Sequence, residues 1–245
     1  MKAAELAKVH AAAAKVYDDL MAKARATKGL RSFDLDSLPT ARPPASNSVP
    51  LNHATRAPQG SHSRMLELSD AFAEQLTLEE TKAISAFSGS AYGGMRHEER
   101  SGALSTATEQ LGKAMAKTRE KPNEEIGVEV WRGVHGIKRA DLEKWLTEGK
   151  CDHGGTASSS WRRQVALNFG SVSEHDDGTF YGSSSAGHFC VVYRWANKSG
   201  RSIETMSRHS SENEFLQPKT TRFQVRAAYH PPGARNVVFL ELEEE

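Results

Sequence analysis

Three short runs in the second half of the sequence contain side chains that could act on a charged substrate. Trp131-Arg132-Gly133 places an arginine near the end of an alternating, β-rich segment, and a guanidinium there can bind a phosphate or carboxylate through two hydrogen bonds. The adjacent glycine lets a ligand approach the backbone. Taken alone, a surface ion pair at the edge of a sheet is the commoner use of such an arginine.

The second run is Ser158-Ser159-Ser160, which fits a short strand. Serine hydroxyls can hydrogen bond to ribose oxygens and can orient a nearby carboxylate. No G-x-S-x-G pattern surrounds the run, so the sequence does not indicate a hydrolase nucleophile. A serine-rich turn is the alternative interpretation.

The third run, Glu212-Asn213-Glu214, is acidic and leads into an apolar pair. Residues two apart on a strand face the same way, so a strand here would place Glu212 and Glu214 on one face. Neighbouring carboxylates repel each other, and such pairs often mark a binding cleft. Glu241-Leu242-Glu243 has the same spacing and is most simply interpreted as solvated, so the spacing alone decides little.

Metal ligation is not expected from this sequence. Cys151, Asp152 and His153 are adjacent, whereas good ligand sets are spaced along the chain, and there is no C-x-x-C or H-E-x-x-H pattern. The run His97-Glu98-Glu99 fits a solvated helical face.

Taken together, the three runs resemble the R-S-E class of ADP-ribosyltransferases over roughly residues 64–245. That family has an arginine ending a strand, then a serine strand, then an E-x-E motif. Four further stretches fit the family: DLEKWLTEGK at 141–150, Ala166 and Phe169 after the serines, ENEFLQPKTTRFQV at 212–225, and Ser88-Gly89-Ser90-Ala91-Tyr92, which resembles the family's tyrosine segment.

The sequence departs from the family pattern at three places. Thr156 stands where the family usually has an aromatic residue before the serines, and Ser159 stands where it usually has threonine. After the tyrosine segment the family usually continues with asparagine and a Tyr-Leu pair, whereas this chain has Arg96-His97-Glu98-Glu99. These departures concern how the adenosine side of the substrate would be held.

The resemblance implies an α+β class, the ADP-ribosyltransferase fold, with N-terminal helices followed by two packed, mainly antiparallel sheets around an NAD cleft. It implies NAD as a substrate and no metal. By match to the motifs, the catalytic residues would be Arg132, Ser158, Glu212 and Glu214. The residues expected to contact NAD are Tyr92, Arg132, Gly133, Ser158, Ser160, Phe169 and Glu214.

The resemblance also implies a role for each group. Glu214 would stabilise the oxocarbenium-like sugar cation that forms as nicotinamide leaves. Ser158 would bond the ribose and hold Glu214, and Arg132 would clamp the phosphates. Glu or Gln at the position of Glu212 goes with arginine acceptors in the family, so an arginine of a target protein is the expected acceptor. Residues 207–211 would touch that protein.

Two alternatives stay open at this point. An NAD glycohydrolase would destroy the cofactor without an acceptor. A packaged or scaffold protein could carry the same domain while its N-terminal helix docks on a partner. Family members of this size are toxins, injected effectors or phage proteins, so we expect action in the cytoplasm of a target or host cell after injection or phage infection.

The composition argues against several other classes of protein. The chain has 245 residues, a net charge of +1 and a mean hydropathy of −0.59, unlike a polybasic nucleic-acid binder. No apolar run approaches the roughly 18–20 residues of a membrane span, and no classical signal peptide is expected. Cys151 and Cys190 cannot form a disulfide scaffold, which favours a reducing compartment. We therefore expect no membrane partner and no requirement for nucleic acid.

Charge and proline divide the chain near residue 60. Residues 1–60 carry nine Lys or Arg and five Asp or Glu, whereas the remainder is net negative. Apolar residues from Leu6 to Leu20 recur at steps of three and four, which predicts an amphipathic helix within residues 1–30 that needs a partner surface. Five of the nine prolines lie between Pro39 and Pro58, so residues 31–60 are expected to be an extended linker. Residues 61–245 would form the catalytic domain.

Within that domain the sequence predicts helices first and strands afterwards, the order of an α+β fold. Helices are expected at 63–75, from the capping box Thr77-x-x-Glu80 through 87, from Thr106-x-x-Glu109 to about 117, and at 139–146. Strands are expected at 126–134, 188–195, 222–228 and 237–243. Residues 170–187, rich in Gly, Ser, His and Asp, are expected to be a loop.

Overall fold

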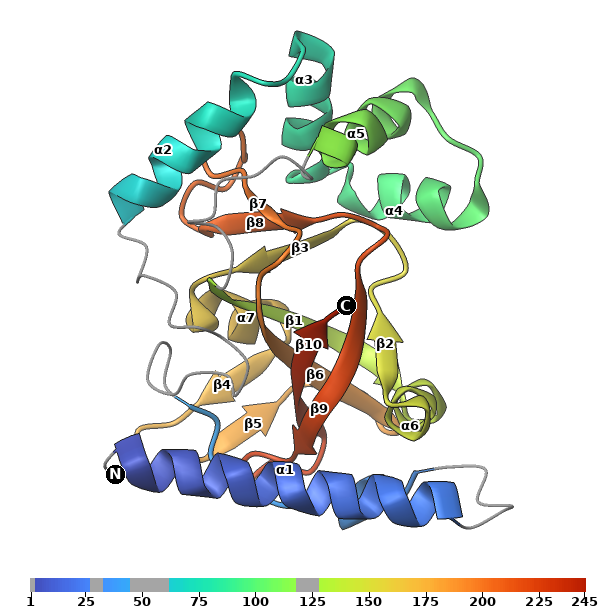
Figure 1. Ribbon diagram of the computed structural model, residues 1–245, viewed down its shortest axis with the longest axis vertical. Helices are drawn as coiled ribbons and strands as arrows, with labels where there is room; N and C mark the ends of the chain where they lie inside the picture. Colours follow the sequence, from blue (N-terminus) through green and yellow to red (C-terminus); the bar gives the residue numbers. More distant parts are fainter. Residues whose placement is uncertain (1–2, 27–32, 45–61, 118–127) are drawn as a thin grey trace.

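The computed structural model describes residues 3–26, 33–44, 62–117 and 128–245 (Figure 1). Its helices are α1 (Ala3–Ala26), the short η1 (Leu35–Ser37), α2 (His62–Ala73), α3 (Leu78–Phe87), α4 (Tyr92–Ser101), α5 (Thr106–Ala116), α6 (Arg139–Glu148) and α7 (Arg163–Phe169). Its strands are β1 (Glu129–Lys138), β2 (Lys150–Asp152), β3 (Ala157–Ser160), β4 (Val172–Glu174), β5 (Phe180–Gly182), β6 (His188–Ala196), β7 (Arg201–Ser202), β8 (Glu214–Gln217), β9 (Arg222–Tyr229) and β10 (Val237–Glu244). The expected α+β class is confirmed.

Eight strands form one curled sheet in the order β2-β9-β10-β6-β1-β3-β8-β7. Neighbouring strands are antiparallel except β10 and β6, which are parallel. In Figure 1, β3, β7 and β8 run across the view beside helices α2–α5, whereas the antiparallel strands β9 and β10 run along it, with α1 near one end of the pair. The separate pair β4–β5 forms a small second sheet. The expected sheets are thus one large curled sheet and one small sheet.

The predicted capping box at the start of α3 is confirmed. The Thr77 hydroxyl accepts a hydrogen bond from the Glu80 amide at 3.3 Å, and the Glu80 carboxylate accepts one from the Thr77 amide at 2.7 Å. These two bonds satisfy amide groups that the first turn of a helix otherwise leaves without partners.

The predicted capping box at the start of α5 is wrong. Ser105 is the N-cap residue, and its hydroxyl accepts from the Thr108 amide. The Glu98 carboxylate of α4 also accepts from the Ser105 hydroxyl at 2.7 Å, from the Thr108 hydroxyl at 2.5 Å and from the Ser105 amide at 2.9 Å. These hydrogen bonds lower the pKa of Glu98 to about 2, so Glu98 anchors α5 instead of lying on a merely solvated face.

The predicted loop at 170–187 contains the β4–β5 hairpin. Val172 and Phe180 are each 3% exposed and pack into a core cluster with Val192 and Phe239. The polar residues of this segment dominate its composition, but these two apolar side chains are enough to attach the hairpin to the main sheet.

The N-terminal helix α1 packs against β9, and this strand is part of the partner surface that its apolar stripe requires. Ala13, Tyr17 and Met21 are buried at helical spacing and face inward, whereas Val16 is 40% exposed. In Figure 1, α1 lies across the end of the molecule opposite helices α2–α5.

Residues 33–44 pack onto the same end of the large sheet. Phe33, Leu35 and Leu38 are at most 3% exposed, and Thr40 forms a β-bridge with His230. One nitrogen of the buried His230 ring lies 3.0 Å from the Leu35 carbonyl oxygen. Residues 31–32 and 45–60 of the predicted linker lie outside the described residues, and the division into helix, linker and catalytic domain stays a prediction.

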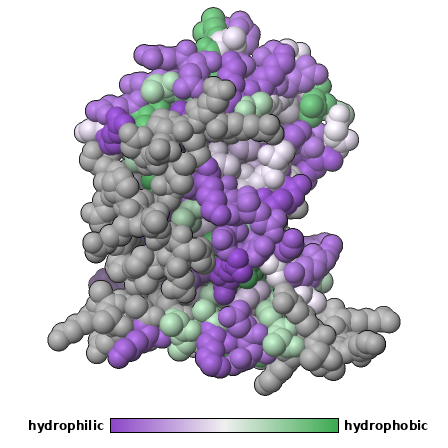
Figure 2. Space-filling model, in the orientation of Figure 1, coloured by the Kyte–Doolittle hydropathy of each residue, from purple (hydrophilic) through white to green (hydrophobic). Residues whose placement is uncertain are grey.

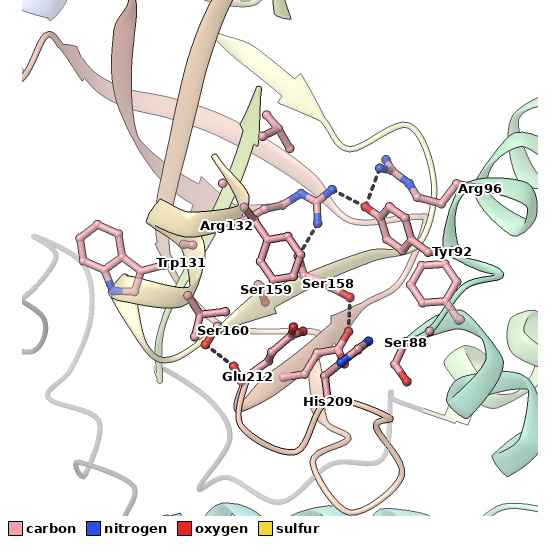
Figure 3. A pocket seen from close by; sticks show the side chains of 18 of the residues that line it. Ser88, Tyr92, Arg96, Trp131, Arg132, Ser158, Ser159, Ser160, His209 and Glu212 are labelled. Carbon is pink, nitrogen blue, oxygen red and sulfur yellow. Dashed lines mark hydrogen bonds between the residues drawn. The ribbon is translucent and has the colours of Figure 1, made fainter. Parts of the chain in front are cut away.

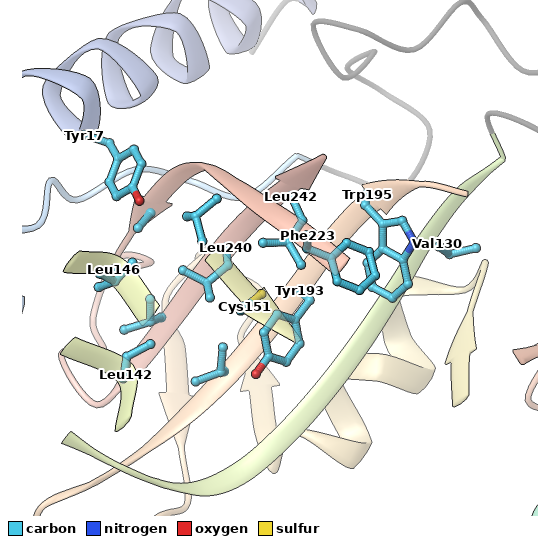
Figure 4. Packing of buried hydrophobic residues seen from close by; sticks show 14 of the residues in the cluster. Tyr17, Val130, Leu142, Leu146, Cys151, Tyr193, Trp195, Phe223, Leu240 and Leu242 are labelled. Carbon is cyan, nitrogen blue, oxygen red and sulfur yellow. The ribbon is translucent and has the colours of Figure 1, made fainter. Parts of the chain in front are cut away.

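The largest core cluster lies inside the large sheet and is closed by α6 and α1 (Figure 4). Its members shown with labels are Tyr17, Val130, Leu142, Leu146, Cys151, Tyr193, Trp195, Phe223, Leu240 and Leu242. On the face drawn in Figure 2 the described surface is mainly hydrophilic, with scattered hydrophobic side chains. None of the described helices has the length and apolar character needed to cross a membrane.

Candidate active site

A cleft of about 540 Å³ opens along the neighbouring strands β1, β3 and β8. Helix α4, helix α7 and the loop before β8 complete its walls, and the volume is typical of a site for a small molecule. The predicted site residues that line it are Tyr92, Arg132, Gly133, Ser158, Ser160, Phe169, Glu212 and Glu214 (Figure 3). The structure therefore brings all of the predicted residues to one cleft.

Arg132 lies on β1 and is 6% exposed. One end of its guanidinium donates to the Ser158 carbonyl, and the other donates to the Tyr92 hydroxyl at 2.7 Å. Arg96, one turn after Tyr92 on α4, donates to the same hydroxyl at 2.9 Å and also to the His153 carbonyl. Two guanidinium groups thus converge on one phenol oxygen at the cleft wall (Figure 3).

These two cations shape the electrostatics of this end of the cleft. Burial alone would raise the pKa of the Tyr92 phenol, but the charges of Arg132 and Arg96 outweigh it and lower that pKa. Burial and repulsion by Arg132 lower the pKa of Arg96. Within the described chain, both guanidinium groups hydrogen bond to neutral oxygens only, so their positive charge is available to attract an anion.

Glu214 is the first residue of β8 and pairs in register with Ser160 of β3. Its carboxylate accepts one hydrogen bond from the Ser158 hydroxyl and one, at 2.8 Å, from the Ser207 hydroxyl. The residue is only 4% exposed, and this burial raises its pKa against the opposing effect of the two hydroxyls. The cleft therefore holds a fixed, poorly solvated carboxylate.

The prediction that Glu212 and Glu214 share one face of a strand is wrong in its geometry. The strand begins at Glu214, and Asn213 has a left-handed backbone with φ of +51°. Glu212 lies in the turn before it, where its carbonyl accepts from the Ser160 hydroxyl at 2.5 Å. Both carboxylates still line the cleft. Burial raises the pKa of Glu212, His209 opposes this, and the Glu214 charge adds to it.

Gly133, Ser160 and Phe169 have roles in the wall that differ from one another. A side chain on Gly133 would collide with the Ala166 carbonyl, so the glycine allows α7 to pack directly on β1. The Ser160 hydroxyl holds the turn at Glu212, as described, and accepts from the Arg162 amide at 2.9 Å. Phe169 ends α7 with 53% of its surface exposed, which leaves its ring free to cover a ligand.

Two departures from the family pattern meet in the structure. The Glu99 carboxylate accepts two hydrogen bonds from Thr156, one from its amide and one from its hydroxyl, each at 2.6 Å. Glu99 thus ties α4 to the segment before β3, close to the bond between Arg96 and His153. Because these residues are 57 positions apart in the sequence, a pattern read along the chain could not reveal that they contact one another.

Arg96, Ser207 and His209 line or support the cleft without a predicted site role. The signal for Arg96 was its position one turn after Tyr92, which places both side chains on one helical face. Ser207 and His209 belong to the loop 207–211, which was expected only to touch a target protein, yet Ser207 holds Glu214 and His209 lines the cleft.

Cys151 and His153, whose residue types can bind metals, have packing roles in the structure. His153 packs on the rings of Tyr193, Trp195 and Phe223, and Cys151 is buried in the main core. Among the described residues, no group of three His, Cys, Asp or Glu side chains is arranged to hold a metal ion.

No family model matches the sequence, and no curated protein matches it in sequence. Solved structures do match the fold. The C3 exoenzyme of Clostridium limosum aligns over 77% of this chain and 98% of its own, with a TM-score of 0.53 and 12% identity. The toxin Plx2a of Paenibacillus larvae aligns over 75% and 94%, with a TM-score of 0.51 and 12% identity. Exoenzyme S of Pseudomonas aeruginosa aligns over 74% and 86%, with a TM-score of 0.50 and 18% identity. The chain therefore has the ADP-ribosyltransferase fold.

Proposed function

We propose that this chain is a mono-ADP-ribosyltransferase that transfers ADP-ribose from NAD to an arginine side chain of a target protein. The observation that carries the proposal is the hydrogen bond between Ser158 and Glu214 in a cleft that also contains Arg132 and Glu212. The neighbouring strands β1, β3 and β8 supply Arg132, Ser158 and Glu214, and the turn before β8 supplies Glu212. The fold shared with known ADP-ribosyltransferases supports the same reaction.

The positive charge at one end of this cleft supports NAD as its substrate. Exoenzyme S is bound to carba-NAD in its structure, which supports NAD as the donor here. The diphosphate of NAD is an anion, and Arg132 would bind it at the end of the cleft where Arg96 adds a second positive charge. The backbone of Gly133 would receive the nicotinamide amide, and the exposed ring of Phe169 would cover the nicotinamide face.

The first half of the reaction breaks the bond between the anomeric carbon of the ribose and the nicotinamide nitrogen. Nicotinamide takes the electron pair and leaves as a neutral molecule, so no general acid is needed. The sugar becomes an oxocarbenium-like cation, which the Glu214 carboxylate stabilises. Ser158 and Ser207 each bind one carboxylate oxygen, so Glu214 is oriented before the charge develops.

The second half forms a bond between an arginine nitrogen and the same carbon. A guanidinium has a pKa above about 12 and is a poor nucleophile while it is charged. A proton must therefore leave the guanidinium as the bond forms, and the Glu212 carboxylate would accept it. Burial and the neighbouring Glu214 raise the pKa of Glu212, which makes it a stronger base than an exposed carboxylate.

The test is incubation of the full chain with labelled NAD, with and without agmatine as a small guanidine acceptor. Wild-type protein should release nicotinamide and form ADP-ribosyl-agmatine, as measured by chromatography and mass spectrometry. Glu212→Ala should lose transfer and keep appreciable NAD hydrolysis, and Glu243→Gln, the matched control in the other E-x-E run, should behave as wild type. Release of nicotinamide with no adduct would instead indicate an NAD glycohydrolase.

The protein partner would be the target that bears the acceptor arginine. Exoenzyme S is in complex with a 14-3-3 protein, and Plx2a is a toxin, so action on a protein inside a target or host cell is the corresponding proposal here. Incubation of host lysate with labelled NAD, followed by mass spectrometry of the labelled band, would identify the target.

A further inference from the structure

Glu204 is a buried acidic residue in the loop that leads from β7 to β8. It is 2% exposed and is not among the residues that line the cleft. One carboxylate oxygen accepts a hydrogen bond from the Asn213 side-chain amide at 2.7 Å, and the His62 ring nitrogen lies 2.9 Å from the same oxygen. Glu204 is thus in direct contact with the residue between the two acidic groups of the site.

The stability of the fold does not explain this carboxylate. Burial raises the pKa of Glu204 against the opposing effects of His62 and Asn213. Its second oxygen has no hydrogen-bond partner among the described residues. Burial of a carboxylate with one bare oxygen carries a desolvation cost that the contacts of the other oxygen offset only in part. Its contribution is therefore better sought in what it holds in place.

What Glu204 holds is the backbone turn at Asn213. Asn213 is 3% exposed and has φ of +51°, a conformation that non-glycine residues rarely adopt. Next to this contact the Ile203 amide donates to the Glu214 carbonyl at 3.0 Å. The two bonds close the loop at its base, and the bond to Asn213 secures the left-handed turn from which Glu212 projects.

The two acidic groups of the site depend on this turn to different degrees. The Glu214 carboxylate has its own hydrogen bonds from Ser158 and Ser207. The Glu212 carboxylate receives none within the described chain, and only its backbone is bound, by Ser160 and by the His209 carbonyl. A disturbance at the turn would therefore displace Glu212 more than Glu214.

Resting on the proposed function, we propose that Glu204 is a positioning residue whose hydrogen bond to Asn213 orients Glu212. It thereby sets the ratio of ADP-ribosyl transfer to an arginine acceptor over hydrolysis by water. Glu204 itself touches neither substrate nor reacting atoms.

The test compares full-length wild type with Glu204→Met and Glu204→Gln. Methionine has a similar length and no acceptor oxygen, whereas glutamine keeps an acceptor for Asn213. The readout is the ratio of ADP-ribosyl-agmatine formed to NAD hydrolysed, with melting temperature measured in parallel. Glu80→Met is the matched control, because Glu80 is also buried but caps α3.

We expect Glu204→Met to lower the ratio about tenfold while hydrolysis stays within about threefold of wild type, the scale of one lost hydrogen bond to a charged group. Its melting temperature should fall modestly, because the buried Asn213 amide loses its acceptor. Glu204→Gln should keep the wild-type ratio. Glu80→Met should melt earlier with an unchanged ratio. Should Glu204→Met fail to fold, Asn213→Gly, which tolerates positive φ and lacks the amide, should give the same drop.

An unchanged ratio in a folded Glu204→Met or Asn213→Gly chain would overturn the positioning role. A parallel loss of transfer, hydrolysis and thermal stability would overturn it as well, since a merely structural residue behaves in that way. If wild-type protein consumes no NAD, the proposed function itself is wrong, and that result is distinct from either of the others.

Discussion

Replacement of Glu214 by glutamine removes one negative charge from the cleft and preserves the size of the side chain. At about 4 Å from a developing sugar cation, a carboxylate contributes about 4 kcal/mol at an effective dielectric constant of about 20, but only about 1 kcal/mol in bulk water. Glu214 is 4% exposed, so the larger value applies. We therefore expect Glu214→Gln to reduce both transfer and NAD hydrolysis by about 10³-fold.

The same substitution should change stability in the opposite direction. Because burial raises the folded-state pKa of Glu214, the folded chain binds this proton more tightly than the unfolded chain does. Its contribution to the free energy of unfolding therefore falls as the pH rises from the ordinary carboxyl range through the raised pKa. Glu214→Gln has no charge to bury, so it should melt at a higher temperature than wild type at neutral pH. The difference should shrink as the pH is lowered into the carboxyl range.

The assay is nicotinamide release with and without agmatine, together with thermal unfolding of both proteins over a series of pH values. Glu243→Gln serves as the control for loss of a negative charge at a residue that does not line the cleft. Transfer by Glu214→Gln within tenfold of wild type would refute the electrostatic role of this carboxylate. A lower melting temperature at neutral pH would refute the reasoning on its burial.

Three further outcomes follow from the described contacts. Arg132→Ala should weaken NAD binding at least about tenfold by titration calorimetry, since charged hydrogen bonds of this kind are worth about 1.5–3 kcal/mol; unchanged binding would make Arg132 purely structural. Ser207→Ala should lower NAD hydrolysis about 10- to 100-fold on the same scale, and full activity would show that Ser158 alone orients Glu214. Leu35→Ala should lower the free energy of unfolding by about 2–5 kcal/mol in denaturant titrations, because Leu35 is fully buried. Leu78→Ala should lower the free energy of unfolding far less, because Leu78 is 64% exposed.

The sequence predicts those features that depend on local patterns. The capping box at Thr77 and the strand-forming runs of β6, β9 and β10 have a local cause, and the structure has these elements close to the expected bounds. The motif order also leads to a common cleft, because Arg132 and Ser158 lie on neighbouring strands of the sheet and Glu214 begins the next one.

Features that depend on tertiary contacts could not be predicted in this way. Strand alternation predicted Glu212 on the same strand as Glu214, but Asn213 has a left-handed backbone and β8 begins only at Glu214. The hydrogen bond of the Asn213 side chain to Glu204 is a tertiary contact that the spacing of the two acidic residues could not indicate. In the same way, the burial of Glu204 and the pairing of Glu99 with Thr156 exist only once α4 and the loop before β8 have packed on the sheet.

The place of β10 has a consequence for how the molecule is assembled. Residues 237–244 form the last of the described strands in the sequence. In space they lie between β9 and β6, inside the large sheet. Before these residues have emerged from the ribosome, β9 and β6 of the nascent chain each present an unpaired edge, and the hydrophobic interior of the sheet is divided. We therefore expect the last steps of folding to follow synthesis of this strand, with slow, non-local pairing. A loss of these eight residues would then prevent folding of the whole domain instead of trimming an edge.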